Sequence, residues 1–142
     1  MKRLRMLVVL GAVAVALPLG LATAKATGST GSSSSVYIQD KADYDFVGTN
    51  LDVGLYVTCK DSTGFGTVNV TVDQYPPETP YPFGAGSGPQ SVVCDGHSHS
   101  VAVTIIGAGF DAGRAKATAA LTTPTNSSGS KTVSRWIEIV PV

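Results

Sequence analysis

The chain contains few of the residues that most often carry chemistry: two cysteines, two histidines and one tryptophan among 142 residues. The two cysteines show no C-x-x-C spacing, which argues against a zinc site or a redox pair. Basic residues are also scarce once the N-terminal segment is set apart, and those that remain are scattered along the chain. Because phosphate binding requires clustered lysine and arginine, nucleic acid is not an expected partner.

Long hydrophobic runs are limited to one, which lies at the N-terminus. A basic start is followed by the apolar run Met6–Leu21 and by two small-residue triplets, Ala22–Ala24 and Ala24–Ala26. This order is typical of a secretory signal peptide, so residues 1–26 are expected to be removed by cleavage after either triplet. The run is shorter than the roughly 20 residues that span a bilayer, and we expect no membrane span in the mature chain.

The mature chain is therefore expected to be secreted, either free or associated with the cell wall. Four of the ten basic residues leave with the signal peptide, so that six face ten acidic residues and the net charge is near −4. Residues 27–34 are only Gly, Ser and Thr, and we expect a flexible leader there. Residues 35–142 have the length of one domain.

A period of two dominates this domain and predicts strands. Apolar and polar residues alternate in Leu51–Cys59 and Val68–Val72, and also in the alanine-rich Ala115–Leu121, where a strand is favoured over a helix. Turn residues at Asp61–Gly64 and Asp95–Gly96 predict hairpin turns. Further strands are expected at Val36–Gln39, Val92–Cys94, Val101–Ile105 and Thr132–Val140, with a short addition at Tyr44–Val47.

About seven short strands separated by turn signals indicate an all-β fold, an antiparallel sandwich or barrel. We expect an immunoglobulin-like antiparallel β-sandwich of about seven strands with one disulfide. The disulfide would join Cys59 and Cys94, because an even cysteine count in an exported chain indicates a bridge and only one pairing exists.

The longest predicted loop is Tyr75–Pro89, which holds five prolines and three glycines. It carries Tyr75, Tyr81 and Phe83, and aromatic side chains held among prolines are suited to anchoring a partner. These three residues form the predicted binding loop. The alternative is a spacer whose aromatic rings fold back onto the sheet.

Asp95, His97 and His99 form the cluster with the clearest metal-ligand chemistry. Residues two apart in a strand face the same side, so both imidazoles could reach one ion, but no further ligand is evident and we expect no metal. Gly107–Ala112 reads as G-x-G-x-x-A after a strand, yet no helix or βαβ unit follows, so we expect no nucleotide cofactor.

Several of these segments together resemble a family of small secreted immunoglobulin-like proteins of high-GC Gram-positive bacteria. They are C-D-G-H-S-H at Cys94–His99, F-D-A-G-R-A at Phe110–Ala115, and Cys59 ahead of Gly66–Val68. The resemblance covers Val36–Ile139 and implies the fold and the disulfide. It supplies no activity and no catalytic residue.

The sequence accordingly predicts a non-enzymatic extracellular binding module. Its partner would be an extracellular protein, a glycan or a small molecule. The alternative is a small-molecule carrier of the antibiotic chromoprotein type, which shares secretion and the sandwich form but has two disulfides.

Overall fold

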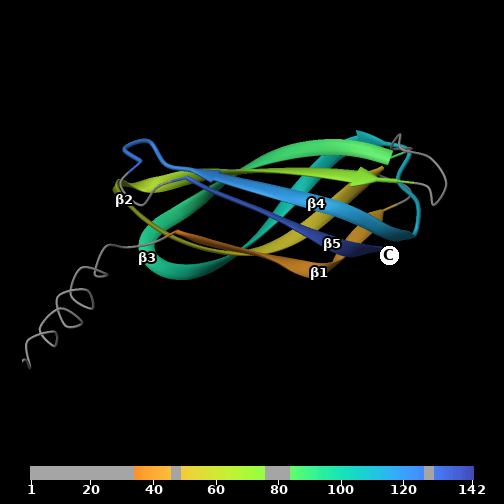
Figure 1. Cartoon of the computed structure of the whole chain (residues 1–142), viewed down its shortest axis with the longest axis horizontal. Coiled ribbons are helices and arrows are strands. Elements are labelled where there is room, and N and C mark those ends of the chain that lie inside the picture. Colours follow the sequence, from red (N-terminus) through yellow and green to blue (C-terminus); the bar gives the residue numbers. More distant parts are fainter. Residues whose placement is uncertain (1–33, 46–48, 76–83, 127–129) are drawn as a thin grey trace, which may run out of the picture. The chain divides into compact units, whose positions relative to one another are not determined.

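Strands make up the regular structure of the part of the chain that can be described. A computed structural model describes residues 34–45, 49–75, 84–126 and 130–142 (Figure 1). The described ranges contain no helix, and therefore none that is long and apolar enough to cross a membrane. The prediction of an all-β fold is confirmed. The five strands are β1 (Ser35–Asp45), β2 (Asn50–Gln74), β3 (Gly84–Ala108), β4 (Gly113–Thr122) and β5 (Lys131–Pro141).

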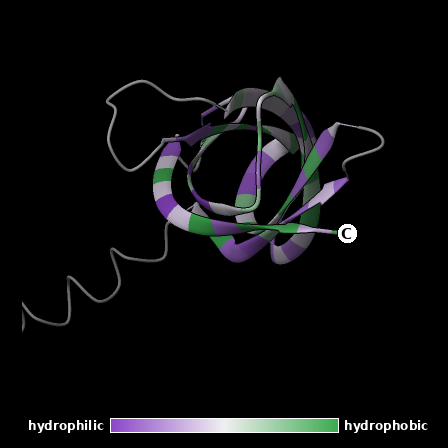
Figure 2. Ribbon diagram, turned by 90° about the vertical axis from the view of Figure 1, so that its right-hand side faces the viewer, coloured by the Kyte–Doolittle hydropathy of each residue, from purple (hydrophilic) through white to green (hydrophobic). Residues whose placement is uncertain are grey.

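The five strands form one sheet that closes on itself. Their order is β1–β5–β4–β2–β3, and β1 also pairs with β2, so β1, β5, β4 and β2 make a closed circuit. The pairing of β1 with β5 is parallel, whereas the other pairings are antiparallel. Viewed along the strands, the sheet curls around its interior, and hydrophilic and hydrophobic bands alternate along the ribbon (Figure 2).

The inward-facing rows predicted from the alternation are confirmed. In the predicted segments of β2 and β4, every second residue is buried, and these buried residues are the predicted rows. The alanine-rich segment is strand rather than helix. The side chains of these rows are fully buried: Leu51, Val53, Leu55, Val57, Val68, Val70, Val72, Ala115, Ala117, Ala119 and Leu121. Strand geometry alone places them on one face.

The prediction of about seven strands is wrong, because segments that were expected to be separate strands are joined into the long strands β2 and β3. The expected hairpin turn at Asp61–Gly64 lies within β2, and the one at Asp95–Gly96 lies within β3. At both places the strand bends instead of reversing, and the register between β2 and β3 shifts around Lys60. Gly64 and Gly96 have positive φ angles of 78° and 90°, a backbone conformation that glycine adopts readily and that is common in turns. Such bulges let a strand pass from one part of a curved sheet to another.

The predicted disulfide between Cys59 and Cys94 is confirmed. Both side chains are 1% exposed, and the bridge joins β2 to β3 beside the two bends. The pair Lys60 and Asp95 follows directly in the register. The bridge therefore covalently links the two long strands where their pairing is irregular.

The predicted loop Tyr75–Pro89 is wrong over Gly84–Pro89, which is the start of β3. Glycines there bring two halves of β3 together. A Cβ on Gly86 would lie 2.8 Å from the Ile106 carbonyl oxygen, and one on Gly88 would overlap that of Thr104. Glycine is needed in this strand because backbone of the same strand packs directly against it.

Asp61 ties the bend of β2 to the connection between β4 and β5. Its Oδ2 accepts hydrogen bonds from the Thr63 backbone N–H at 3.0 Å and from the Thr63 hydroxyl at 2.5 Å. Its Oδ1 accepts from the Thr125 backbone N–H at 3.2 Å and from the Thr125 hydroxyl. The hydroxyls of Thr125 and Thr63 hold the pKa of this buried carboxyl well below its ordinary range.

We expect wild-type stability to fall more steeply than that of Asp61→Asn as the pH drops from about 5 to about 2. The folded-state pKa lies below the value of 3.8 taken for an unperturbed carboxyl, so the ionised carboxylate stabilises the fold above that value. This contribution is lost as the pH falls towards the folded-state pKa. Urea unfolding at a series of pH values measures the slope. Asp43→Asn, on the exposed side of β1, is the control, and equal slopes for wild type and Asp61→Asn would contradict the assignment.

The connection from β3 to β4 is held by two buried side chains. Gln74, which is 2% exposed, donates from Nε2 to the Asp111 carbonyl and accepts from the Asp111 N–H, both at 2.9 Å. Phe110 is buried and meets Tyr44 edge-on at 6.2 Å between ring centroids. The G-x-G-x-x-A segment is thus a strand end followed by an anchored connection to another strand.

Candidate functional site

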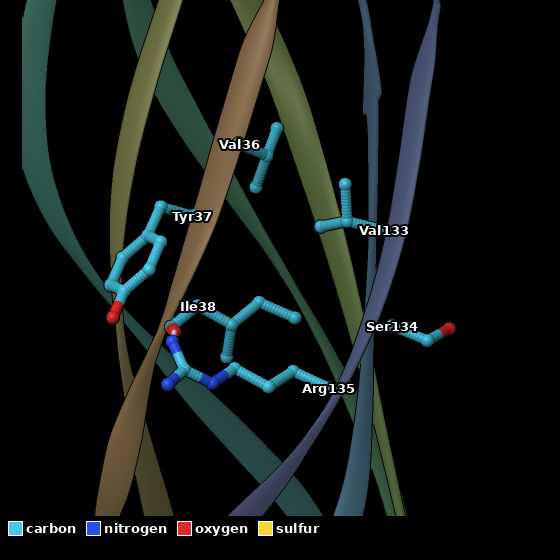
Figure 3. Close-up of a pocket in the computed structure, with 6 residues that line it drawn as sticks. All are labelled: Val36, Tyr37, Ile38, Val133, Ser134 and Arg135. Atoms are coloured by element: carbon cyan, nitrogen blue, oxygen red, sulfur yellow. Dashed lines mark hydrogen bonds between the residues drawn. The ribbon is translucent and has the colours of Figure 1, made fainter.

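The circuit of strands is closed by a short ladder between β1 and β5. The two strands pair only from Lys41 opposite Glu138 to Tyr44 opposite Pro141. Before that point, β1 pairs with β2 and β5 pairs with β4. We use the term seam for the part of this boundary where Val36–Ile38 faces Val133–Arg135 (Figure 3).

Arg135 lies beside the place where this ladder stops, next to the register shift of β1 between Ile38 and Ala42. It lies opposite Ala117 in the register, between Val133 and Ile137, and so occupies an inward-facing position of β5. A guanidinium cannot be buried without polar partners, because desolvation of the charge is too costly. The side chain therefore crosses the seam, and its Nη1 donates to the carbonyl oxygen of Ile38 at 2.9 Å. That contact occupies a β1 carbonyl on the side that faces β5.

Two further contacts hold the guanidinium in place. Its Nη2 lies 3.1 Å from Oδ1 of Asp40, and its central carbon lies 4.8 Å from the ring centroid of Tyr37. Hydrogen bonding to the Tyr37 side chain and the charge of Asp40 raise the pKa of Arg135 above its ordinary value. The group is a permanent, well-positioned cation.

A hollow of about 410 Å³ lies in the seam. Val36 and Val133 project toward it from opposite strands, and Ile38 and Arg135 lie at its end (Figure 3). Val36 and Ile38 belong to the core, and Val133 packs against it, so the base of the hollow is apolar. The hollow thus combines an apolar base with the polar side chains of Tyr37, Ser134 and Arg135.

Exposed aromatic rings border the seam on the outer surface. Tyr37 lines the hollow and is 50% exposed, and Tyr56 of β2 is 47% exposed. Their ring centroids are 6.3 Å apart with planes tilted by 38°. The pair extends the apolar surface of the hollow onto the outside of the sheet.

Of the three aromatic residues of the predicted binding loop, the structure describes Tyr75. Tyr75 follows the end of β2 and is 39% exposed. Tyr81 and Phe83 lie outside the described residues. Their role as a binding surface stays a prediction.

The cluster of Asp95, His97 and His99 is brought together around one carboxylate. Asp95 Oδ1 lies 2.8 Å from His99 Nε2 and accepts the His97 backbone N–H at 2.9 Å. The contact with the His99 side chain, followed by that with the His97 backbone, lowers the pKa of Asp95. Within the part of the chain that the structure describes, no three His, Cys, Asp or Glu side chains are arranged to hold a metal ion. The arrangement stabilises the bend of β3 by local hydrogen bonds.

Sequence reasoning missed Arg135, Tyr37 and Asp40. A signal for the first was present, because the row Val133, Arg135, Ile137 is an apolar alternation interrupted by a charge. A charged residue at an inward position marks a place where a strand edge is left unpaired or a polar partner is near. Its neighbours on β1 could not be named without the topology.

No family model matches the chain, and no curated protein is significantly similar to it.

Proposed function

We propose that the mature chain is a secreted, immunoglobulin-like, non-enzymatic binding module whose ligand site is the hollow in the seam. The observation that carries this proposal is the hollow itself, which interrupts an otherwise closed circuit of strands. The signal-like N-terminus and the disulfide support an extracellular location, because disulfides persist in oxidising compartments. A concave surface that combines apolar side chains with a few polar groups is typical of ligand sites.

The polar groups of the hollow favour binding over catalysis. Covalent catalysis needs a nucleophile activated by an adjacent base. The hydroxyl of Ser134 is 2.9 Å from that of Thr118 and so pairs with another hydroxyl. Arg135 with Asp40 forms an ion pair, which can orient a ligand.

Transport of a small molecule is a second candidate function, and the size of the hollow favours it. Its volume of about 410 Å³ falls within the range of roughly 300 to 1,000 Å³ of small-molecule sites. A carrier would retain its cargo through purification. A native mass spectrum of the secreted protein with an additional bound mass would favour this candidate over a module that binds a macromolecule.

Val133→Trp tests the location of the site. The indole would fill the hollow, so the variant is expected to lose at least about tenfold in affinity, roughly 1.4 kcal/mol, for whatever the wild type retains. The measurement compares ligands retained by secreted wild type and variant, using native mass spectrometry for small molecules and capture from culture supernatant and cell wall for macromolecules.

Thr132→Trp is the matched control, because Thr132 is exposed, neighbours Val133 and lies opposite Ala120 on the other face of β5. The control should retain the ligand, and both variants should keep a cooperative thermal transition. Equal retention by both variants would remove the site from the seam. A wild type that retains nothing would overturn the binding-module proposal.

A further inference from the structure

From the lining of the seam we infer that its ligand is a compact apolar carboxylate, an aliphatic or aromatic acid with one anionic group. This inference rests on the proposed function and names the ligand class for the same site. The acid would place its apolar body against Val133 and the ring of Tyr37, over the base formed by Val36 and Ile38, and its carboxylate on the guanidinium of Arg135.

The walls of the hollow determine the apolar part. Val36 and Ile38, which are at most 9% exposed, form its base, and the partly exposed Val133 and the half-exposed ring of Tyr37 supply the apolar surface that a ligand can reach. Covering this apolar surface with a hydrocarbon group removes it from water, which is favourable. The apolar base offers no hydrogen-bond partner to the hydroxyl groups of a sugar, which favours a hydrocarbon group over a glycan at that place.

The cation determines the charged part. A guanidinium has five N–H donors, more than its contacts with Ile38, Asp40 and Tyr37 require. Those contacts hold Arg135 across the seam before a ligand arrives, so little conformational freedom is lost on binding. A carboxylate fits the planar arrangement of its donors, whereas a cationic ligand would be repelled.

Asp40 is an exchangeable partner. Its side chain is 71% exposed and that of Arg135 is 36% exposed, and ion pairs of such exposure contribute little. A ligand carboxylate can share or replace Asp40 at the guanidinium while the bond to the Ile38 carbonyl stays in place. Removal of the Asp40 charge should therefore strengthen the binding of an acid.

The test is a calorimetric titration of the mature protein with four probes: hexanoate, 3-phenylpropionate, hexan-1-ol and hexylamine. The two acids should bind at one site at least about tenfold more tightly than the alcohol, and the amine should bind most weakly. Arg135→Gln should reduce hexanoate affinity at least about tenfold and hexan-1-ol affinity clearly less. Asp40→Asn should raise hexanoate affinity.

Lys131→Gln is the matched control, because it removes an exposed cation from the same strand outside the hollow. Its hexanoate affinity should equal that of wild type. Equal affinity for the acids and the alcohol, or no effect of Arg135→Gln in a folded protein, would overturn the inference. Failure of every probe to bind would also overturn it. In that case, a native ligand that is retained by wild type and lost in Val133→Trp would still support the proposed function.

Discussion

Replacement of Cys94 by Ser is expected to lower the free energy of unfolding by about 2 to 5 kcal/mol. The bridge to Cys59 spans 35 residues of sequence, and loss of this cross-link restores conformational freedom to the unfolded chain. It also leaves a polar hydroxyl and a free thiol at positions that are 1% exposed. Urea unfolding followed by the fluorescence of Trp136, the one tryptophan of the chain, measures the change.

Val93→Ser is the control for this prediction, because it introduces the same side chain at the neighbouring position, which is 44% exposed. Its cost should be much smaller, since exposed positions tolerate substitution. Labelling of the denatured, unreduced wild type with a thiol reagent should give no signal. A loss below about 1 kcal/mol in Cys94→Ser would contradict a stabilising bridge.

Gly88→Ala is expected to cost about 1 to 3 kcal/mol, and more if the strand cannot shift. The added Cβ would overlap the carbonyl oxygen of Thr104, which is backbone of the same long strand β3 and cannot rotate away. To relieve the overlap, one of the two halves of β3 would have to move together with the part of β2 that is paired with it. Thermal or urea unfolding measures the loss.

Gly54→Ala separates this steric effect from the ordinary effect of adding a methyl group to a strand glycine. A Cβ there would come within 2.7 Å of Gln39, but only of the end of its side chain, which can adopt another rotamer. The control should therefore lose clearly less stability than Gly88→Ala. Similar stability for both variants would show that the two halves of β3 do not need glycine to pack.

Alternation in the sequence predicts the inward rows of β2 and β4 because the side-chain period of a strand is fixed by backbone geometry. The cysteine pairing was equally accessible, because an even count of two leaves one choice. The number of strands was not accessible. A glycine in a bend and a glycine in a hairpin have the same conformational preference, so Gly64 and Gly96 carry turn signals in either case.

Whether a chain reverses or bends at such a glycine depends on pairing with distant residues. β2 and β3 pair along nearly their whole length, from Asn50 opposite Ile106 to Gln74 opposite Gly84, so both bend together. For a similar reason, the glycines at the start of β3 predict a loop when only the sequence is considered. Their partners, such as Thr104, lie well over a dozen residues further along the chain.

The candidate site depends on topology more than the core does. The charge at Arg135 within an apolar row was visible in the sequence, but the row does not reveal which strand lies opposite. The parallel pairing of β1 with β5 brings the first and last strands of the domain together, and this places Ile38 and Asp40 within reach of the guanidinium. Contacts between the two ends of a domain leave no local pattern.

The seam is tested most directly by the amide chemical shifts of the mature protein during titration with hexanoate. A ligand in the hollow should shift the amide signals of Val36–Ile38 and Val133–Arg135 most, with smaller changes in the rest of β1 and β5. The shifts should saturate together and disappear in Val133→Trp. Saturable binding whose largest shifts fall at Asp95–His99 or Tyr75, with the seam unchanged, would contradict the assignment of the site.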